Sequence, residues 1–414
     1  MNGGSLPAFE RGTEWLRGVG EACDVVMSSR VRLARNLAGR PFQTTADDAE
    51  RGEVLELVRT ALDGADMPVV AGDLGRGVAS GERMSWLDLR MLSEFERELL
   101  VERQLVSRQH ARGQVPGSGP RESLPRGVAI GLPGERVSVM VNEEDHLRVQ
   151  AVCSGLSLEQ ALREADAVDD ALEGRLDYAY SPRFGYLTAC PTNVGTGLRL
   201  SVMLHLPALK MTGDIEKVRR AADGMALAVR GFHGEGSEHA GDFYQLSNQT
   251  TLGKSERMLL DEIGGDLIPR VIDYERHARR ELMTRKRVLI EDRVHRAHGT
   301  LLGARLLEAD EAMELLSLVR LGVVLGLIDG LAQQAVNGLV LGVQPAHLRR
   351  LSGADLSQHQ RCIERARLVR ERLARGERER AARDVPVDGP GDRAGGADGV
   401  DVDNAGEGAG EGAG

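Results

Sequence analysis

The sequence has few lysines, aromatic residues and cysteines, and each shortage limits the kinds of core or site that the chain can form. Aromatic residues make up only 3% of the 414 residues, so the core must be built from Leu, Val, Ile, Ala and Met. Arginine supplies nearly all of the 53 basic residues, a bias that we attribute mainly to overall composition, although arginine forks suit oxyanions at individual sites. The cysteines form no CxxC pair, which argues against a structural zinc site or a disulfide framework; they are Cys23, Cys153, Cys190 and Cys362.

Charge and hydropathy argue against further classes of protein. The formal net charge of -10 argues against nucleic acid as the main partner. The first residues lack the basic and then apolar pattern of a secretory signal. Residues 321–343 are rich in apolar side chains, but Asp329, Gln333 and Asn337 interrupt them, which favours a buried helix over a membrane span. We therefore predict a cytoplasmic protein with no membrane or nucleic-acid partner.

Composition divides the chain into four parts. After an N-terminal segment (1–23), residues 24–255 mix strand-like runs with Gly and Pro turns, which predicts a domain of strands and helices. Residues 256–375 have the pattern of nearly continuous helix, which predicts a helical bundle shared between subunits. Residues 376–414 are acidic and rich in Gly and Ala. Such a stretch cannot bury enough apolar surface to order itself, so a disordered tail is predicted.

Three segments alternate apolar and polar residues with the period of two that is typical of strands: 137–142, 146–151 and 199–206. The runs 24–30, 184–190, 225–232 and 243–249 also suit strands, and 46–62 and 91–106 suit helices. Further along the chain, apolar residues at helical spacing predict helices over 272–298, 309–326 and 331–341.

Arginines recur on the predicted strands. Arg30 and Arg32 would share one face of an extended segment, and Arg148, Arg199 and Arg230 come from three other predicted strands. Any one of them alone is most simply a solvated arginine or half of a salt bridge. Five guanidinium groups on one sheet face would repel one another unless an anion lay between them, and a nucleoside triphosphate supplies such an anion. Because the chain has neither a Walker A sequence nor a kinase Gly-rich loop, side chains would have to hold the phosphates, with magnesium to orient them.

Acidic residues and one cysteine complete the set of candidate groups. Glu143, Glu144 and Asp145 are adjacent at a predicted strand junction, and Glu235 lies in a glycine-rich turn. Composition alone favours solvated loops for these acids. Cys190 stands in a loop containing Gly and Pro that could present its thiol to a cleft, although most free cysteines are inert buried groups.

Together these segments resemble the phosphagen (guanidino) kinase superfamily, and most of all the bacterial protein-arginine kinases of the McsB type. The matching stretches are SSRVRLARN (28–36), VSVMVNEEDHLRVQ (137–150), GYLTACPTNVGTGLRLSVMLHLPAL (185–209), RGFHGEG (230–236) and YQLSNQTTLGKSE (244–256). The C-terminal helical region is similar to the same family to about residue 370. The resemblance implies an α+β fold, in which an antiparallel sheet flanked by helices is followed by an all-α helical bundle that forms a homodimer.

The resemblance also implies roles for individual residues. Glu144 and Glu235 would hold the substrate guanidinium, with Cys190 beside them, and no metal ligand is expected from the chain. Gln104 stands where the family commonly has a His that touches the nucleotide. ATP with Mg²⁺ would be bound by Ser28, Ser29, Arg30, Val31, Arg32, Gln104, Arg148, Arg199, Leu200, Ser201, Val202, Met203, Arg230, Gly231, Phe232, His233, Gly234 and Glu235.

A second motif of the family, R-D-x-x-R-A, binds phosphoarginine allosterically. Here it reads Arg361-Cys362-Ile363-Glu364-Arg365-Ala366. Both arginines remain, but Cys362 replaces the acid that would pair with the guanidinium. We therefore predict an allosteric site at Arg361, Arg365 and Ala366 with weakened or altered phosphoarginine feedback.

The function implied is ATP-dependent phosphorylation of exposed arginine residues in proteins, which marks them for an AAA+ unfoldase–protease in the stress response. A stress-gene repressor and a zinc-binding activator protein are further implied partners. One alternative is a kinase for free arginine or another small guanidino compound. Superfamily members with small substrates usually have an N-terminal helical domain, whereas only residues 1–23 precede Asp24 here, which favours protein substrates. The other alternative is a non-catalytic phosphoarginine-binding scaffold. Glu144, Glu235 and the arginine set argue against it, because a binding module needs no pair of carboxylates to deprotonate a guanidinium.

Overall fold

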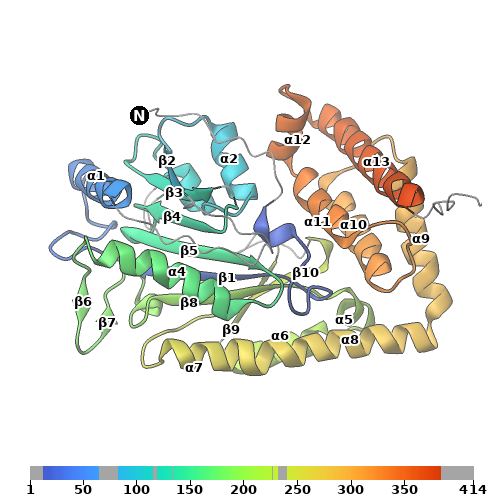
Figure 1. Ribbon diagram of the computed structural model, residues 1–414, viewed down its shortest axis with the longest axis horizontal. Coiled ribbons are helices and arrows are strands. Elements are labelled where there is room, and N and C mark those ends of the chain that lie inside the picture. Colours follow the sequence, from blue (N-terminus) through green and yellow to red (C-terminus); the bar gives the residue numbers. More distant parts are fainter. Residues whose placement is uncertain are drawn as a thin grey trace, which may run out of the picture.

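The computed structural model describes residues 13–64, 83–114, 119–132, 134–225, 227–231 and 240–383. Within these residues the chain forms one large antiparallel sheet with helices packed against it, followed by a group of C-terminal helices (Figure 1). The predicted α+β fold class is confirmed.

Eight strands form the sheet in the order β2-β3-β4-β5-β1-β8-β10-β9, and each pair of neighbours is antiparallel. The three strands predicted from alternation are β4 (Val137–Val141), β5 (Leu147–Ser154) and β8 (Leu198–His205). The longest strand, β1 (Val26–Arg35), lies between β5 and β8. The remaining strands are β2 (Arg83–Asp88), β3 (Gly127–Leu132), β9 (Leu227–Gly231) and β10 (Phe243–Asn248).

The strand predicted over 184–190 is present only near its start. β7 (Gly185–Tyr186) pairs with β6 (Tyr180–Ser181) in a small separate hairpin. The rest of that run joins no strand ladder, and Pro191 then opens a short 3-10 helix, η2 (Pro191–Asn193).

Helices cover the sheet along its length. The first helix of the catalytic part, α1 (Asp48–Gly64), agrees with the prediction over 46–62, whereas the predicted 91–106 helix is shorter, as α2 (Glu94–Glu102). A capping box starts α2, because Ser93 accepts from the Glu96 amide and the Glu96 carboxylate accepts from the Ser93 amide. Positive φ at Gln104 (63°) turns the chain away after it. The others are α3 (Arg108–Arg112), α4 (Leu158–Glu173), α5 (Pro207–Thr212), α6 (Ile215–Gly224), α7 (Glu256–Leu260), a π-helical turn (Asp261–Leu267) and α8 (Ile268–Arg285).

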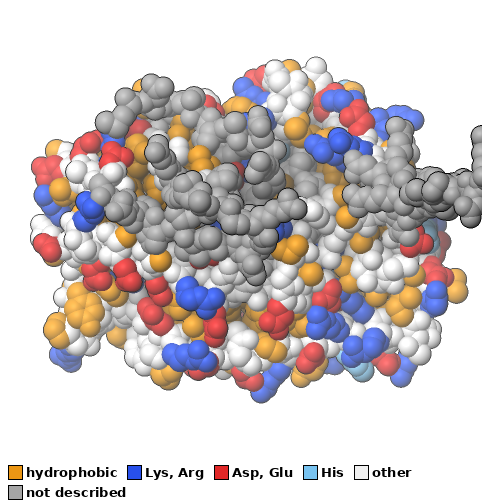
Figure 2. Space-filling view, in the orientation of Figure 1, with side chains coloured by type: hydrophobic (Ala, Val, Ile, Leu, Met, Phe, Trp, Pro, Cys, Tyr) orange, Lys and Arg blue, Asp and Glu red, His pale blue; other side chains and the backbone are white. Residues whose placement is uncertain are grey.

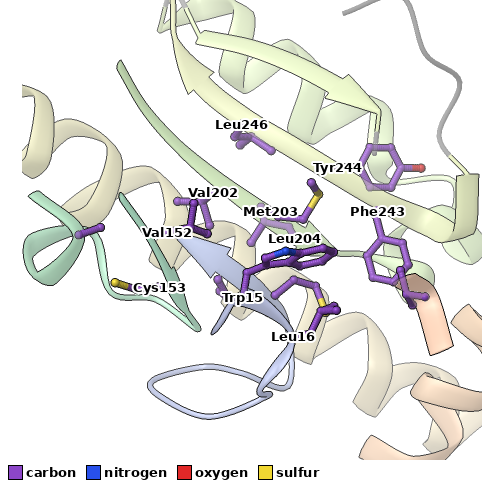
Figure 3. Close-up of a cluster of buried hydrophobic side chains, with 14 of the residues drawn as sticks. Trp15, Leu16, Val152, Cys153, Val202, Met203, Leu204, Phe243, Tyr244 and Leu246 are labelled. Carbon is purple, nitrogen blue, oxygen red and sulfur yellow. The ribbon is translucent and has the colours of Figure 1, made fainter. Parts of the chain in front are cut away.

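The core of the catalytic part is aliphatic, as the scarcity of aromatic residues required. Val31 and Leu33 of β1 are fully buried, as are Ala161 and Ala165 of α4, which contacts β1 and β5. The N-terminal segment joins this core, since Trp15 is only 2% exposed in the short 3-10 helix η1 (Glu14–Leu16). Figure 3 shows Trp15 and Leu16 among buried side chains of β8 and β10.

The C-terminal helices are α9 (Arg287–Gly303), α10 (Ala309–Val324), α11 (Gln333–Gly342), α12 (Pro345–Ser352) and α13 (Gln358–Arg383). The single helix predicted over 272–298 is wrong, because Lys286 (φ -136°, ψ 31°) separates α8 from α9. α8 packs against α5, whereas α9 packs against α10 and α13.

The end of α13 also differs from the predicted boundary. The tail predicted from residue 376 begins inside α13, which continues to Arg383. Residues 384–414 lie outside the described part of the chain.

Acidic and basic side chains are interspersed on the face seen in Figure 2, along the edge formed by α7 and α8. No helix in the described ranges is long and apolar enough to cross a membrane.

Candidate active site

The five predicted arginines line one cleft, which has a volume of about 1250 Å³. Arg30 and Arg32 alternate along β1, Arg148 lies on β5, Arg199 on β8 and Arg230 on β9. Strand register brings them together, since Arg32 pairs with Arg199 and Ala34 with Arg148. The sheet therefore collects on one face the guanidinium groups that the sequence distributes over four strands.

The cleft is strongly electropositive at this face. Burial, followed by the charges of Arg199, Arg148 and Arg230, lowers the pKa of Arg30 to about 10. Burial, then Arg30, Arg148 and Arg199, holds the pKa of Arg32 well below its usual value. Arg30 donates to the neutral groups Ser201 Oγ (3.3 Å) and Gln245 Oε1 (2.9 Å). Buried like charges that repel one another in this way are stabilised by a polyanion.

Glu143 and Glu144 stand at the turn between β4 and β5 and have different surroundings. The Glu143 side chain is almost fully buried, accepts from Ser107 Oγ (2.6 Å) and pairs with Arg148 Nη1 (2.7 Å). Burial alone would raise the pKa of Glu143, but Arg148 and then Ser107 outweigh it and lower the pKa. The Glu144 side chain is 31% exposed, lines the cleft and accepts from Arg148 Nη2 (2.7 Å). Glu144 is therefore the carboxylate of the pair that a substrate can reach.

A buried polar cluster supports this turn, and the sequence analysis did not identify it. Asn142 has positive φ (61°); its Oδ1 accepts from Gln43 Nε2, and its Nδ2 donates to the carbonyls of Arg51 and Pro125. His146 accepts from the Leu37 amide through Nδ1 and contacts the Pro41 carbonyl through Nε2. The available signal was the polar run Asn142–His146 itself, which composition alone made look solvated.

Cys190 lies in the loop 187–197, which is tied to the sheet along its length. The thiol is half-buried, 3.0 Å from Thr192 Oγ1. Asn193 from the same loop lines the cleft. Thr251 Oγ1 donates to the Val194 carbonyl (2.7 Å), and Arg35 Nη1 donates to the Thr196 carbonyl (2.9 Å).

The other residues predicted to contact the nucleotide lie partly in the cleft and partly inside or behind the sheet. Gln104 lines the cleft, and its carbonyl accepts from Gln150 Nε2 (2.7 Å). Ser29 Oγ donates to the Gly155 carbonyl (2.9 Å), behind the arginine face. The remaining residues of the two strand segments are buried in the sheet; they are Ser28, Val31, Leu200, Ser201, Val202 and Met203. Gly231 ends β9, whereas Phe232, His233, Gly234 and Glu235 lie outside the described residues.

Helices from the C-terminal part also border the cleft. Ala309 at the start of α10 and Gln344 and Pro345 before and at the start of α12 line it together with Glu102 of α2. The Glu102 carboxylate accepts from the amides of Ala346 (2.8 Å) and His347 (2.9 Å). A carboxylate at a helix N-terminus is favourable, so Glu102 fixes α12 against the catalytic part.

The predicted allosteric motif lies on α13. Arg361 is partly exposed and donates to Gln358 Oε1 (2.8 Å). Arg365 is buried and donates to the carbonyls of Val343 (2.9 Å) and Leu307 (2.8 Å), while Ala366 is fully buried. Cys362 Sγ donates to Glu308 Oε1 (3.1 Å), and burial followed by Glu308 raises the pKa of this thiol.

Within the described ranges, no three His, Cys, Asp or Glu side chains are grouped closely enough to hold a metal ion. The cleft instead offers guanidinium groups to an anionic ligand, and the carboxylate of Glu144 to a cationic one.

Two family models match the chain in succession. ATP:guanido phosphotransferase, C-terminal catalytic domain, matches residues 72–278, and the protein-arginine kinase McsB C-terminal domain matches residues 287–384.

Curated relatives match over nearly their whole length. The protein-arginine kinase of Moorella thermoacetica is 43% identical over 366 residues, which cover 88% of this chain and 99% of that protein. The protein-arginine kinase of Symbiobacterium thermophilum is 42% identical over 363 residues, which cover 87% and 97%.

Among solved structures, the duplicated taurocyamine kinase of Schistosoma mansoni with bound transition state analog components superposes with a TM-score of 0.50 at 23% identity. The match covers 66% of this chain and 36% of that one, and it bears on the fold alone. With both family domains in order and relatives matched nearly end to end, this chain belongs to the protein-arginine kinase family and is a phosphotransferase.

Proposed function

We propose that this protein transfers the γ-phosphoryl group of ATP to arginine side chains of proteins. The observation that carries the proposal is the cleft in which five arginines face a reachable carboxylate, Glu144. The arginines suit the triphosphate of ATP, and Glu144 suits a substrate guanidinium. Glu144 already accepts from the guanidinium of Arg148, which supports its capacity to hold such a group.

The chemistry follows from the acidity of the acceptor. A guanidinium has a pKa of roughly 12.5–13.8 and is therefore protonated and weakly nucleophilic. Glu144, with Glu235 as the proposed second carboxylate, would orient its nitrogens and accept a proton as the P–N bond forms. Arg30, Arg32 and the other cleft arginines would stabilise the charge on the transferring phosphoryl group.

Mg²⁺, when bound with ATP, would supply positive charge that neutralises the phosphates. The side chains that face the phosphates in the cleft are positively charged. The phosphates of ATP, and not these side chains, would therefore be the ligands of the metal. Cys190, half-buried in the loop beside the cleft, would complement the positive charge of the substrate as a thiolate.

Protein substrates are favoured over free arginine by two observations. The named relatives are protein-arginine kinases matched over 97–99% of their length. The cleft is also bordered by α10 and α12 of the C-terminal helices, so part of its wall belongs to a domain that the family model assigns to protein-arginine kinases. From the same family membership we propose that the modified proteins pass to an AAA+ unfoldase–protease. We also propose that a stress-gene repressor and a zinc-binding activator are partners. The protein itself would be a cytoplasmic homodimer.

The test is incubation with ATP, Mg²⁺ and a loosely folded arginine-rich protein, followed by mass spectrometry without acid. We expect acid-labile phosphate on arginine. Phosphorylation of free arginine without labelling of the protein would favour a kinase for small guanidino compounds. If neither free arginine nor the protein were phosphorylated, the non-catalytic phosphoarginine-binding scaffold would remain.

Glu144→Gln tests the role of the carboxylate in the same assay. We expect a loss of about 10²- to 10⁴-fold in kcat, because Gln can hold a nitrogen but cannot take its proton. The matched control is Glu159→Gln on α4, whose side chain is 64% exposed and away from the cleft. Near-wild-type activity of Glu144→Gln would exclude the proposed role.

A further inference from the structure

The loop that carries Cys190 and the turn that carries Glu144 are joined by one buried side chain, Asp145. Asp145 Oδ1 accepts from the Ala189 amide (2.7 Å), so the residue after Glu144 is bonded to the residue before Cys190. The Asp145 side chain is completely buried.

Asn36, the residue that follows β1, completes this connection. Its Nδ2 donates to Asp145 Oδ1 (2.7 Å) and to the Leu187 carbonyl (3.0 Å). Its Oδ1 accepts from the His146 amide (2.9 Å). Asn36 therefore holds the start of the Cys190 loop and the Glu144 turn at the end of the strand that carries Arg30 and Arg32.

Burying the Asp145 carboxyl group in this arrangement destabilises the fold, which suggests that the group is kept for the geometry it imposes. Asp145 Oδ2 is buried and has no hydrogen-bond partner, whereas both donors converge on Oδ1. Burial, the largest cause, raises the pKa of Asp145 despite these bonds. A buried carboxyl group with an unpaired oxygen destabilises a fold. Apolar packing would fill the same space without that cost.

We propose that Asp145 is a positioning residue, which fixes Cys190 relative to Glu144 so that both meet the same acceptor guanidinium. It touches neither ATP nor the acceptor, and it acts through the Ala189 amide. The inference deepens the proposed kinase function and rests on it. Loss of the bond would release the Cys190 loop near Ala189 while leaving the arginine face intact, because Arg35 and Thr251 hold the other end of the loop.

The test combines a chemical and a kinetic measurement on the full chain. The chemical readout is the rate at which iodoacetamide alkylates Cys190, followed by mass spectrometry, with buried Cys153 as the internal reporter of global unfolding. In Asp145→Ala we expect the Cys190 rate to change by at least threefold while Cys153 stays protected. Kinetically, we expect kcat/KM for the protein substrate to fall 10-fold or more, with the KM for ATP within twofold of wild type.

Asp145→Asn is the conservative variant, because its amide oxygen can still accept from Ala189 and Asn36. It should restore both readouts to near wild type. The matched control is Glu275→Ala, which removes another buried carboxylate that accepts two backbone amides, those of Ala208 (3.1 Å) and Leu209 (2.9 Å). It should lower thermal stability without a selective change at Cys190.

Unchanged Cys190 alkylation in Asp145→Ala, or the same change in Glu275→Ala, would overturn the proposal. If Asp145→Ala does not fold, Asp145→Leu, which fills the same space but offers no acceptor to the Ala189 amide, is held to the same expectation. The alkylation readout does not depend on catalysis. A wild-type protein without kinase activity would therefore refute the proposed function, while the alkylation result would still decide whether Asp145 positions the loop.

Discussion

At the scale of single residues, Arg30 shows how the cleft is specialised, because it is buried among like charges. Arg30 donates to a serine and a glutamine and faces three other arginines. Buried like charges of this kind destabilise a protein unless an anion lies between them.

Arg30→Gln should therefore separate stability from binding. Without nucleotide we expect a Tm no lower than that of wild type, because one buried like charge is removed. The Kd for ATP should rise about 10- to 100-fold, since hydrogen bonds to charged groups contribute about 1.5–3 kcal/mol each. Thermal denaturation with and without ATP–Mg²⁺ measures both effects. Arg90→Gln, which removes an exposed partner of Asp88, is the control, and an equal loss of ATP binding there would contradict the interpretation.

At the scale of elements, α13 connects the altered R-C-I-E-R-A motif with the wall of the cleft. Arg365 donates to the carbonyls of Leu307 and Val343, which shortly precede Ala309 and Gln344 in the chain. Ala309 and Gln344 line the cleft. We therefore propose that a phosphoarginine bound near Arg361 and Arg365 would affect the cleft through these two backbone segments.

Cys362→Asp tests this regulatory role of α13. The new carboxylate would lie beside Glu308, which now accepts from the Cys362 thiol, and two neighbouring acids would attract a guanidinium. We expect a slightly lower Tm and a several-fold stronger kinetic response to added phosphoarginine. Cys362→Ser keeps a donor for Glu308 and should behave like wild type. No gain of response in Cys362→Asp would count against the proposed site.

At the scale of the whole molecule, Arg320 of α10 joins the C-terminal helices to the catalytic sheet. It is fully buried, and its guanidinium donates to the carbonyls of Cys23 (2.8 Å) and Asp24 (3.1 Å), to His205 Nδ1 (2.7 Å) and to Asn337 Oδ1 (3.0 Å). Burial lowers the pKa of Arg320 to about 9. One side chain thus satisfies acceptors from β8, α11 and the segment before β1.

Arg320→Met should lower the free energy of unfolding by roughly 3 kcal/mol or more, because several buried acceptors would lose their donor at about 1–3 kcal/mol each. Denaturant unfolding followed by circular dichroism measures the loss. The exposed Arg305 of the same region gives the control Arg305→Gln, which should stay within about 0.5 kcal/mol of wild type. A similar stability for both variants would show that Arg320 does not join the two parts.

Local patterns predicted much of the fold and part of the site. Alternating apolar residues identified β4, β5 and β8, because successive side chains of a strand point to opposite faces of the sheet. They could not locate the break at Lys286, because a backbone change within a charged helical pattern leaves no periodic signal. Ser107 and Asn36 were not identified near the candidate site, and the bond of Asp145 to Ala189 was not predicted, since their partners are 36 to 151 residues away in the chain.

The sequence by itself determined the chemistry that this protein can bring together, namely arginines on alternate strand positions, adjacent acids at a turn and a cysteine after a strand-like run. Strand alternation and residue type are local properties, so they can be read without a fold. The tertiary structure decided which groups meet. Pairing of β1 with β5 and β8 gathered the arginines, and burial separated Glu143 from the reachable Glu144. Such selection depends on strand register and on distant partners, which only the folded chain fixes.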